Sequence, residues 1–192
     1  DHPTTAEDDA NARLDRMAWI RDTFGLVIGS ERGAAFAAPV VHFAHGMTTG
    51  AFGSWGDDEL TKDKESPYYL GGWWPPDGPA VFVKQVPLRP HYYTFHYDPA
   101  YRLPLYQTVF HDSLIATHHW GRHSLKFSDQ VGTVALTELL YGVPPLYHMN
   151  LAEFEKHGER IKAHYAFFSP LHRQIGALPM TDFEWLSADR MV

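Results

Sequence analysis

The first thirty residues change from a helical to a strand-like pattern of apolar positions. The segment TTAEDDANARLDRMAWIRDTFG opens with a threonine cap and acidic residues, and its apolar side chains then recur at helical intervals. Gly25 marks the end of this helix. The run LVIG, residues 26–29, is short, apolar and rich in β-branched residues, which is typical of a buried parallel strand. The pattern predicts a helix and then a strand, with Ser30 and Glu31 just beyond its carboxyl end.

Residues 32 to about 100 lack this regularity. They are rich in Gly, Pro and aromatic residues, as in SPYYLGGWWPPDGP, and they contain few helical periods. Stretches of this kind inside a regular domain are usually long loops with short elements of their own. We therefore expect a long insertion here.

Regular patterns return near residue 103 and continue almost to the end of the chain. The predicted elements are a strand over 103–112 that ends at His111 and Asp112, a helix over 129–142 closed by Gly142, a short strand over 144–150, and a long helix over 151–176 broken near Pro170. Alternating strands and helices with short connections indicate a parallel sheet covered by helices.

The position of the polar residues favours a barrel over a doubly wound sheet. Glu31, then His111 with Asp112, then His148 with Asn150 each follow a predicted strand. In a (β/α)8 barrel the carboxyl ends of all strands open on one face, so Glu31, Asp112 and His148 should point to one end of the sheet. A complete barrel needs about 250 residues. The predicted fold is therefore α/β, a partial (β/α)8 (TIM) barrel that comprises the C-terminal half, with the aromatic- and Gly/Pro-rich insertion at about 32–100.

Composition limits the classes of partner. The 192 residues include 44% hydrophobic and 20% charged residues, as in globular domains, and they suffice for one domain. A formal charge of -7 argues against nucleic-acid binding, which needs a clustered positive surface. No apolar run is long enough to span a membrane, and no signal peptide opens the chain. Without cysteine there is neither a disulfide framework nor a thiolate metal site, and the cellular compartment stays open.

The stretch QTVFHDSLIATHHWGRHSLKF, residues 107–127, contains four histidines and has three readings. His118, His119 and His123 could bind zinc if the segment were helical, although Gly121 and the β-branched residues argue against a helix. Alternatively, His111 and Asp112 hold sugar hydroxyls while Trp120 supports a pyranose ring. In the third reading all of these are hydrogen-bonded core and supporting groups.

Glu31 is the candidate for acid–base chemistry. Glycoside cleavage requires one protonated carboxyl to release the leaving oxygen and one ionised carboxyl to attack or to activate water. A glutamate behind an apolar strand and beside aromatic residues is placed for partial desolvation, which raises a carboxyl pKa toward the range of a general acid. The alternative is an ordinary solvated glutamate in a loop.

Several other polar positions have both a functional and a structural reading. Trp73 and Trp74 could line a sugar subsite or attach the insertion to the barrel. The acidic run WGDDE could bind calcium through its oxygens or be a solvated charged segment. The remaining candidates are His42 and His45, which could face the cleft if Val40–Phe43 is a strand, and Arg89, His91 and Tyr92.

Four segments together resemble a known family. GLVIGSERG, LPLYQTVFHDSLIATHHWG, LLYGVPPLYHMN and FFSPLHRQIGALPMTDFEWLSADRMV, in this order and spacing, are similar to the barrel of glycoside hydrolases of families 101 and 129, which act on α-linked N-acetylgalactosamine, and to their uncharacterised relatives. The similarity is weakest in the insertion, and it is greater to the exo-acting or uncharacterised branch.

The resemblance implies a retaining glycosidase with Glu31 as the acid/base. It places the nucleophilic Asp upstream of residue 1 and a β-sandwich beyond the tail, so the chain, residues 1–192, is expected to be a single partial catalytic domain. Its expected partners are a carbohydrate and the other barrel half of the same polypeptide, and the isolated chain is expected to be inactive. The sugar contacts are expected from His111, Asp112, Trp120, His148, Trp73 and Trp74. No cofactor is expected apart from the calcium alternative.

Two rival functions remain open at this point. A noncatalytic carbohydrate-binding or degenerate barrel would keep the aromatic pocket without working carboxylates. A metal-dependent hydrolase would instead use the histidine cluster.

Overall fold

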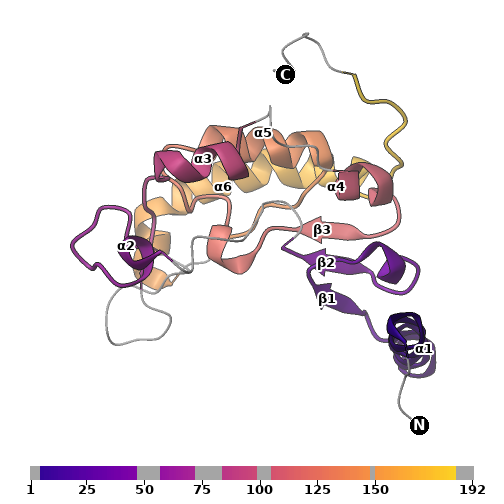
Figure 1. Cartoon of the computed structure of the whole chain (residues 1–192). Helices are drawn as coiled ribbons and strands as arrows, with labels where there is room; N and C mark the ends of the chain where they lie inside the picture. The colour runs from indigo at the N-terminus through magenta and orange to yellow at the C-terminus, as the bar shows by residue number, and fades with distance from the viewer. Residues whose placement is uncertain (1–4, 47–56, 72–83, 99–104, 148–149, 185–192) are drawn as a thin grey trace.

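Three short parallel strands organise the computed structural model, which describes residues 5–46, 57–71, 84–98, 105–147 and 150–184 (Figure 1). The strands are β1 (Gly29–Glu31), β2 (Phe43–His45) and β3 (Ile115–Thr117), in the spatial order β1-β2-β3. The helices are α1 (Ala6–Phe24), α2 (Asp58–Thr61), α3 (Pro90–His96), α4 (Leu105–Phe110), α5 (Val131–Tyr141) and α6 (Leu151–Ile175), with short 3₁₀ turns at Ala35–Ala37 and Trp120–Arg122. The chain is thus a mixed α/β structure with parallel strands, as predicted.

Helix α1 begins and ends at the predicted signals. The Thr5 hydroxyl accepts the backbone N–H of Asp8, and the Asp8 carboxylate accepts the backbone N–H of Thr5, which forms a capping box. Gly25 closes the helix with φ of 62°, in the left-handed region that glycine adopts without strain. The strand that follows starts at Gly29, slightly later than predicted. Glu31 is consequently the last residue of β1 rather than the residue beyond it.

The middle strand of the sheet lies inside the range expected to be an insertion. β2 pairs with β1 on one side and with β3 on the other, so residues 43–45 belong to the sheet itself. The range 32–100 therefore includes one strand of the sheet and does not consist of inserted residues alone. A three-residue strand has too little sequence to show a period, which explains why the sequence offered a strand here, at Val40–Phe43, only as a possibility.

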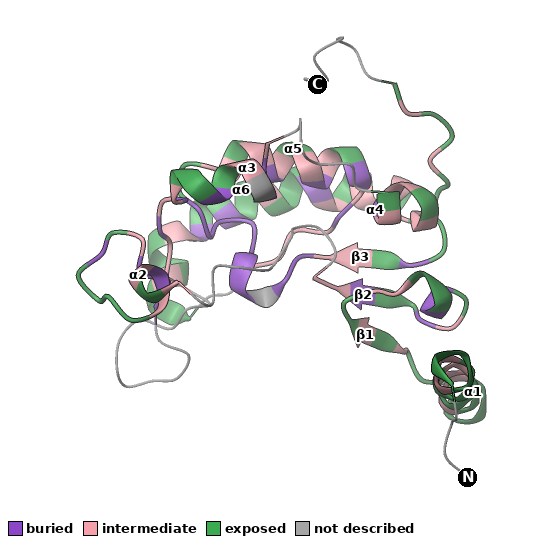
Figure 2. Ribbon diagram, in the orientation of Figure 1, coloured by how far each residue is buried: buried purple, intermediate pink, exposed green. Residues whose placement is uncertain are grey.

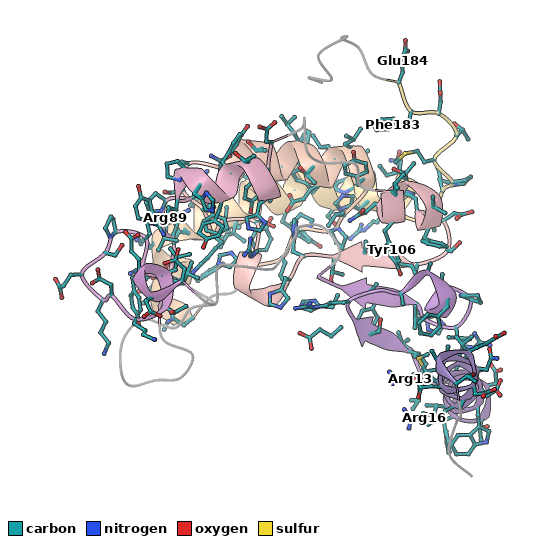
Figure 3. All side chains as sticks on the ribbon, viewed as in Figure 1. Arg13, Arg16, Arg89, Tyr106, Phe183 and Glu184 are labelled. Atoms are coloured by element: carbon teal, nitrogen blue, oxygen red, sulfur yellow. The ribbon has the colours of Figure 1, made fainter. Side chains whose placement is uncertain are left out.

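The strand predicted over residues 103–112 is wrong, because residues 105–110 form helix α4. Tyr106 and Phe110 are four residues apart, which places them on one side of a helix rather than on one face of a strand. Both pack with Leu114 in the cluster beside the sheet, and the ring centroids of Tyr106 and Phe110 lie 4.9 Å apart. Tyr106 lies between α4 and the sheet (Figure 3). The strand follows later, as β3.

Two further expectations near the C-terminus need correction. Residues 144–147 form no strand; there the backbone of Leu146 exchanges hydrogen bonds with Ser124. Helix α6 continues through Pro170 instead of breaking there. A proline in a helix removes one N–H donor, and buried Phe168 and Ile161 hold the helix before this point. The helix predicted over 129–142 is confirmed as α5, with Gly142 at its end.

Two apolar clusters hold the described elements together, and Figure 2 shows where the buried residues lie along the ribbon. The first packs the residues between β2 and β3 against the segment after β3 and against α5; it contains Leu60, Leu70, Val86, Leu88, Tyr92, Tyr97, Phe127 and Val134. The second packs α1 and α4 against one face of the sheet; its buried members are Ala37, Ala38, Val41, Ala44 and Leu114. None of the helices in the described part of the chain is long and apolar enough to cross a membrane.

A buried lysine ties the residues between β2 and β3 to the segment that follows β3. Lys126 is fully buried, and its Nζ donates to the carbonyl oxygens of Leu70 at 3.0 Å and Lys84 at 2.6 Å. Val86 forms an isolated parallel bridge with Phe127 beside it. Burial lowers the pKa of Lys126 to about 7, and the nearby charge of Lys84 adds to this effect.

This shift predicts a specific pH dependence of stability. Between about pH 7 and pH 10.5 the unfolded chain binds a proton at Lys126 that the folded chain has released, so stability should rise with pH in this window. We expect Lys126→Met to remove this rise, which is on the order of a few kcal/mol. The free energy of unfolding, measured by denaturant titration from pH 6.5 to 10, tests it.

The control is Lys62→Met, because the Lys62 side chain is 73% exposed and its ion pair with Asp58 lies at the surface. That variant should follow the pH dependence of the unmodified protein. If the curves for Lys126→Met and Lys62→Met are parallel, Lys126 is not the group that titrates.

Candidate active site

The last residues of the three strands are neighbours across the sheet. Glu31 is paired in register with His45, and His45 is paired with Thr117. Side chains alternate between the two faces of a strand, so these three share a face, while Ala44, fully buried, points to the opposite face and its apolar cluster. The carboxyl end of the sheet therefore carries an acid, an imidazole and a hydroxyl side by side, and the Glu31 side chain is 61% exposed.

His119 completes this group from the segment that follows β3. Its Nε2 lies 3.7 Å from Glu31 Oε1, and its ring lies 5.5 Å from the ring of His45. Nδ1 of His119 accepts the backbone N–H of Gly121 at 3.2 Å. On the other side, His45 Nδ1 is 3.1 Å from the Thr117 hydroxyl. We call Glu31, His45, Thr117 and His119 the strand-end site.

Burial keeps both imidazoles of the strand-end site in the neutral form at neutral pH. Desolvation is the main cause that lowers the pKa of His119 to about 4; the nearby His45, Arg122 and Arg32 contribute to the shift, and Glu31 opposes it. Desolvation also lowers the pKa of His45. Because Nδ1 of His119 accepts a hydrogen bond, the proton of the neutral ring is on Nε2, the nitrogen that lies 3.7 Å from Glu31 Oε1.

A buried carboxylate anchors the segment that carries His119. Glu138 of α5 is fully buried, and its Oε1 accepts hydrogen bonds from His118 Nε2 at 2.7 Å and from the Ser124 hydroxyl at 2.6 Å. Its Oε2 lies 3.5 Å from Nε2 of His164 in α6, and the other nitrogen of His164 is paired with the Tyr147 hydroxyl. We call this set the Glu138 network. It ties the residues after β3 to α5, to the segment before α6 and to α6.

His111 and Asp112 lie at the other end of the sheet. They follow α4 and precede β3, so they are at the amino end of that strand, whereas Glu31 ends β1. The expectation that Glu31 and Asp112 share a pocket is therefore wrong, and the misplaced strand over 103–112 is its cause. His111 Nδ1 is 2.5 Å from the carbonyl oxygen of Leu178, and Asp112 accepts the Ser113 hydroxyl.

The zinc reading is also wrong for the described residues. His118, His119 and His123 are not on one helix, and their nitrogens bond in different directions: to Glu138, to Gly121 and to the backbone N–H of Leu125. Within the described ranges no group of three or more histidine, aspartate or glutamate side chains could hold a metal ion. Most of the cluster fits the reading as hydrogen-bonded core groups.

Acidic residues of the run after Trp55 form a local ion-pair network with Arg89. Asp57 caps α2 and contacts the guanidinium of Arg89, while the Tyr92 hydroxyl donates to its Oδ2 at 2.9 Å. Arg89 also contacts Glu59 at 2.9 Å. Arg89 projects among the side chains near α2 and α3 (Figure 3). These residues hold the α2 and α3 region together, which agrees with the structural reading of the acidic run.

One of the other candidates has a structural role, and several lie outside the described residues. His42 accepts the backbone N–H of Ile28 at 3.0 Å before β2 begins, so it supports the amino end of the sheet. Trp73, Trp74 and His148 lie outside the described residues, and so does the side chain of Trp120.

Sequence reasoning missed His119 as the neighbour of Glu31. The signal was present in SLIATHHWG, where a β-branched run ends in two histidines. The preceding run, LPLYQTVFHD, is longer and equally apolar, so the strand was predicted there instead. His45 was recognised only as one of several histidines. It lies beside Glu31 because β2 ends at His45 and pairs in register with β1, which the sequence does not show.

A polar group at the carboxyl end of a parallel sheet is in the position where α/β enzymes place their catalytic residues. The comparison with known families agrees with this class. A family model described as glycosyl hydrolases related to the GH101 family, GH129, matches residues 1–192. The chain belongs to this glycosyl hydrolase family, which confirms the resemblance seen in its four segments. No curated protein and no solved structure matches the chain.

The Glu138 network predicts a stability effect. Glu138→Gln keeps the shape of the side chain but replaces charge-assisted hydrogen bonds to His118 and Ser124 by weaker ones. We expect a loss of about 1 to 3 kcal/mol in the free energy of unfolding, measured by denaturant titration at pH 7. The control Glu155→Gln, on the exposed side of α6, should stay within about 0.5 kcal/mol. Equal tolerance at both positions would contradict an anchoring carboxylate.

Proposed function

We propose that the chain forms part of the catalytic barrel of a retaining glycosidase that acts on α-linked N-acetylgalactosamine or a related hexose, with Glu31 as the acid/base. The observation that carries the proposal is the position of Glu31, which ends a parallel strand beside His45 and His119 in a chain of a glycosyl hydrolase family. The sugar and the retaining mechanism come from the resemblance to families 101 and 129.

The two faces of the sheet support a barrel. Helices α1 and α4 pack on the face of Ala44, as helices do on the outside of a barrel wall. The opposite face presents Phe43 and Ile115, which are 38% and 49% exposed, together with the residues of the strand-end site. An apolar layer of this kind is covered in a barrel by the strands across the interior. In the proposal those strands belong to another part of the same polypeptide.

In the proposed reaction Glu31 acts twice. It first protonates the glycosidic oxygen while a carboxylate nucleophile attacks the anomeric carbon, and it then deprotonates the water that releases the sugar. In retaining enzymes the two carboxyl groups are about 5 to 5.5 Å apart. Asp112 lies at the other end of the sheet, so the proposal assigns the nucleophile to the strand that would pair with the open edge of β1. Trp73, Trp74, Trp120 and His148 remain proposed sugar contacts.

The test is Glu31→Gln in the full-length polypeptide. Loss of the proton donor should reduce kcat/KM by about 10² to 10⁴ for a substrate with a poor leaving group. The loss should be much smaller for a dinitrophenyl glycoside, whose leaving group needs no proton, and azide should restore turnover by attacking the glycosyl intermediate. Steady-state kinetics on the two substrates, with and without azide, measure both effects.

Glu155→Gln serves as the matched control and should leave both rates unchanged. Equal losses on the two substrates, with no response to azide, would remove Glu31 from the acid/base role. Binding of the sugar without any turnover by the unmodified protein would instead favour a noncatalytic carbohydrate-binding barrel.

A further inference from the structure

We propose that a second site, a pocket between helix α6 and the segment that follows α5, binds an acidic sugar, which is a pyranose ring that carries a carboxylate. The residues that line this pocket are Pro144, Pro145, Tyr147, Tyr165, Phe168, Ser169, His172 and Arg173. None of them belongs to the strand-end site or to the sugar contacts proposed above. The second site therefore does not depend on the catalytic role of Glu31.

The size and the walls of the pocket suit a single sugar ring. Its volume is about 310 Å³, which is in the range of pockets that hold small molecules. Two prolines and Tyr147 line it from the segment after α5, and the buried ring of Phe168 lines it from α6. Proline and aromatic rings offer flat apolar surfaces, and these pack against the face of a pyranose that carries C–H groups.

Contacts outside the pocket hold these walls in place. The Tyr147 hydroxyl is paired with Nδ1 of His164, so Tyr147 offers its ring to the pocket. The His164 ring in turn lies 4.3 Å from the ring of Phe168, measured between centroids, and the Phe168 ring lies 5.6 Å from that of His172. A pocket whose walls are already ordered loses less conformational entropy when a ligand binds.

Three polar residues of α6 lie along one side of the pocket. Tyr165, Ser169 and Arg173 are four residues apart in turn, so they share one side of the helix. Hydrogen bonding to Ser169 and the charge of Arg173 lower the pKa of Tyr165, which shows that its hydroxyl lies close to both groups. Tyr165 and Arg173 are exposed, so these groups are at the mouth of the pocket, where a ligand reaches them.

Arg173 gives the pocket a preference for an anion. It is the only lining residue that is charged at neutral pH, because desolvation lowers the pKa of His172 although the nearby Glu138 opposes this shift. Within the described ranges, none of the ion pairs of the chain involves Arg173. A guanidinium group recognises a carboxylate through two parallel hydrogen bonds.

The hydroxyl groups beside Arg173 favour a sugar over an aromatic acid. The Tyr165 and Ser169 hydroxyls both donate and accept hydrogen bonds, and the hydroxyls of a pyranose match them. An aromatic carboxylate would satisfy the guanidinium but would leave these two hydroxyls without a ligand partner. Carbohydrate is also the class of ligand that a glycosyl hydrolase family handles.

The experiment compares methyl β-D-glucuronide with methyl β-D-glucoside, two glycosides that differ only in a carboxylate or a hydroxymethyl group on C5. Dissociation constants are measured by NMR titration of the full-length polypeptide. The glucuronide should bind about tenfold more tightly, because hydrogen bonds to charged groups are the stronger ones. Arg173→Gln should reduce this preference to about twofold or less.

The matched control is Arg160→Gln, which removes the same charge from an exposed residue of α6 that does not line the pocket. It should keep the preference for the glucuronide. The proposal is overturned if the unmodified protein shows no preference, if the preference survives Arg173→Gln, or if Arg160→Gln removes it equally.

Two further measurements test the wall and the class of ligand. Tyr165→Ala removes an exposed ring from the pocket and should weaken both glycosides by about threefold or more, whereas unchanged binding of both would contradict the proposal. Benzoate supplies the carboxylate on an aromatic ring. If benzoate binds more tightly than the glucuronide, the pocket takes aromatic acids and the proposed sugar is wrong.

The failure of this proposal can be told apart from that of the proposed function. Glu31→Gln should leave the preference for the glucuronide unchanged, because Glu31 is not part of the pocket. If Glu31→Gln shows the expected leaving-group dependence and azide response while the preference is absent, only the second site is wrong. If the preference follows Arg173 while Glu31→Gln shows neither kinetic effect, the second site stands and the acid/base role fails.

Discussion

The register of three parallel strands is the constraint on which the candidate site depends. Each strand has three residues, and the pairing of Glu31 with His45 and of His45 with Thr117 is what brings an acid, an imidazole and a hydroxyl to one sheet end. A shift of any strand by one residue would turn its side chains to the opposite face. Such a shift would put Ala44 among the polar groups and His45 against the apolar cluster, so the core and the site favour the same register.

Strands this short cannot hold their register alone, and the neighbouring structure supplies the rest. Helices α1 and α4 pack on the Ala44 face, while the Glu138 network ties the continuation of β3 to α5 and α6. Burying a carboxylate is costly unless its oxygens accept strong hydrogen bonds, and here His118 and Ser124 provide two. The network joins segments that are distant in sequence, and it fixes the backbone beside His119.

The sequence predicted those helices whose ends are set by capping residues close to them in the chain. Thr5 and Gly25 delimit α1, and Gly142 ends α5, because caps act within a few residues. Helix α4 was mistaken for a strand because Thr108 and Val109 are β-branched, and the spacing of Tyr106 and Phe110 matters only once the buried side is known. The same holds for the site. Glu31 was identified from the apolar run beside it in the sequence. The place of His119 depends on the bounds of β3 and on the pairing of β2, which only the tertiary structure shows.

The contacts of Lys126 have a consequence for how the residues between β2 and β3 can change during evolution. The Lys126 Nζ donates to two backbone carbonyls, at Leu70 and Lys84, and every amino acid supplies a carbonyl. Substitution of the side chain at position 84 therefore leaves this attachment in place, provided that the backbone path is kept. The side chains of this region can thus vary while one lysine, outside the region, keeps its backbone in place.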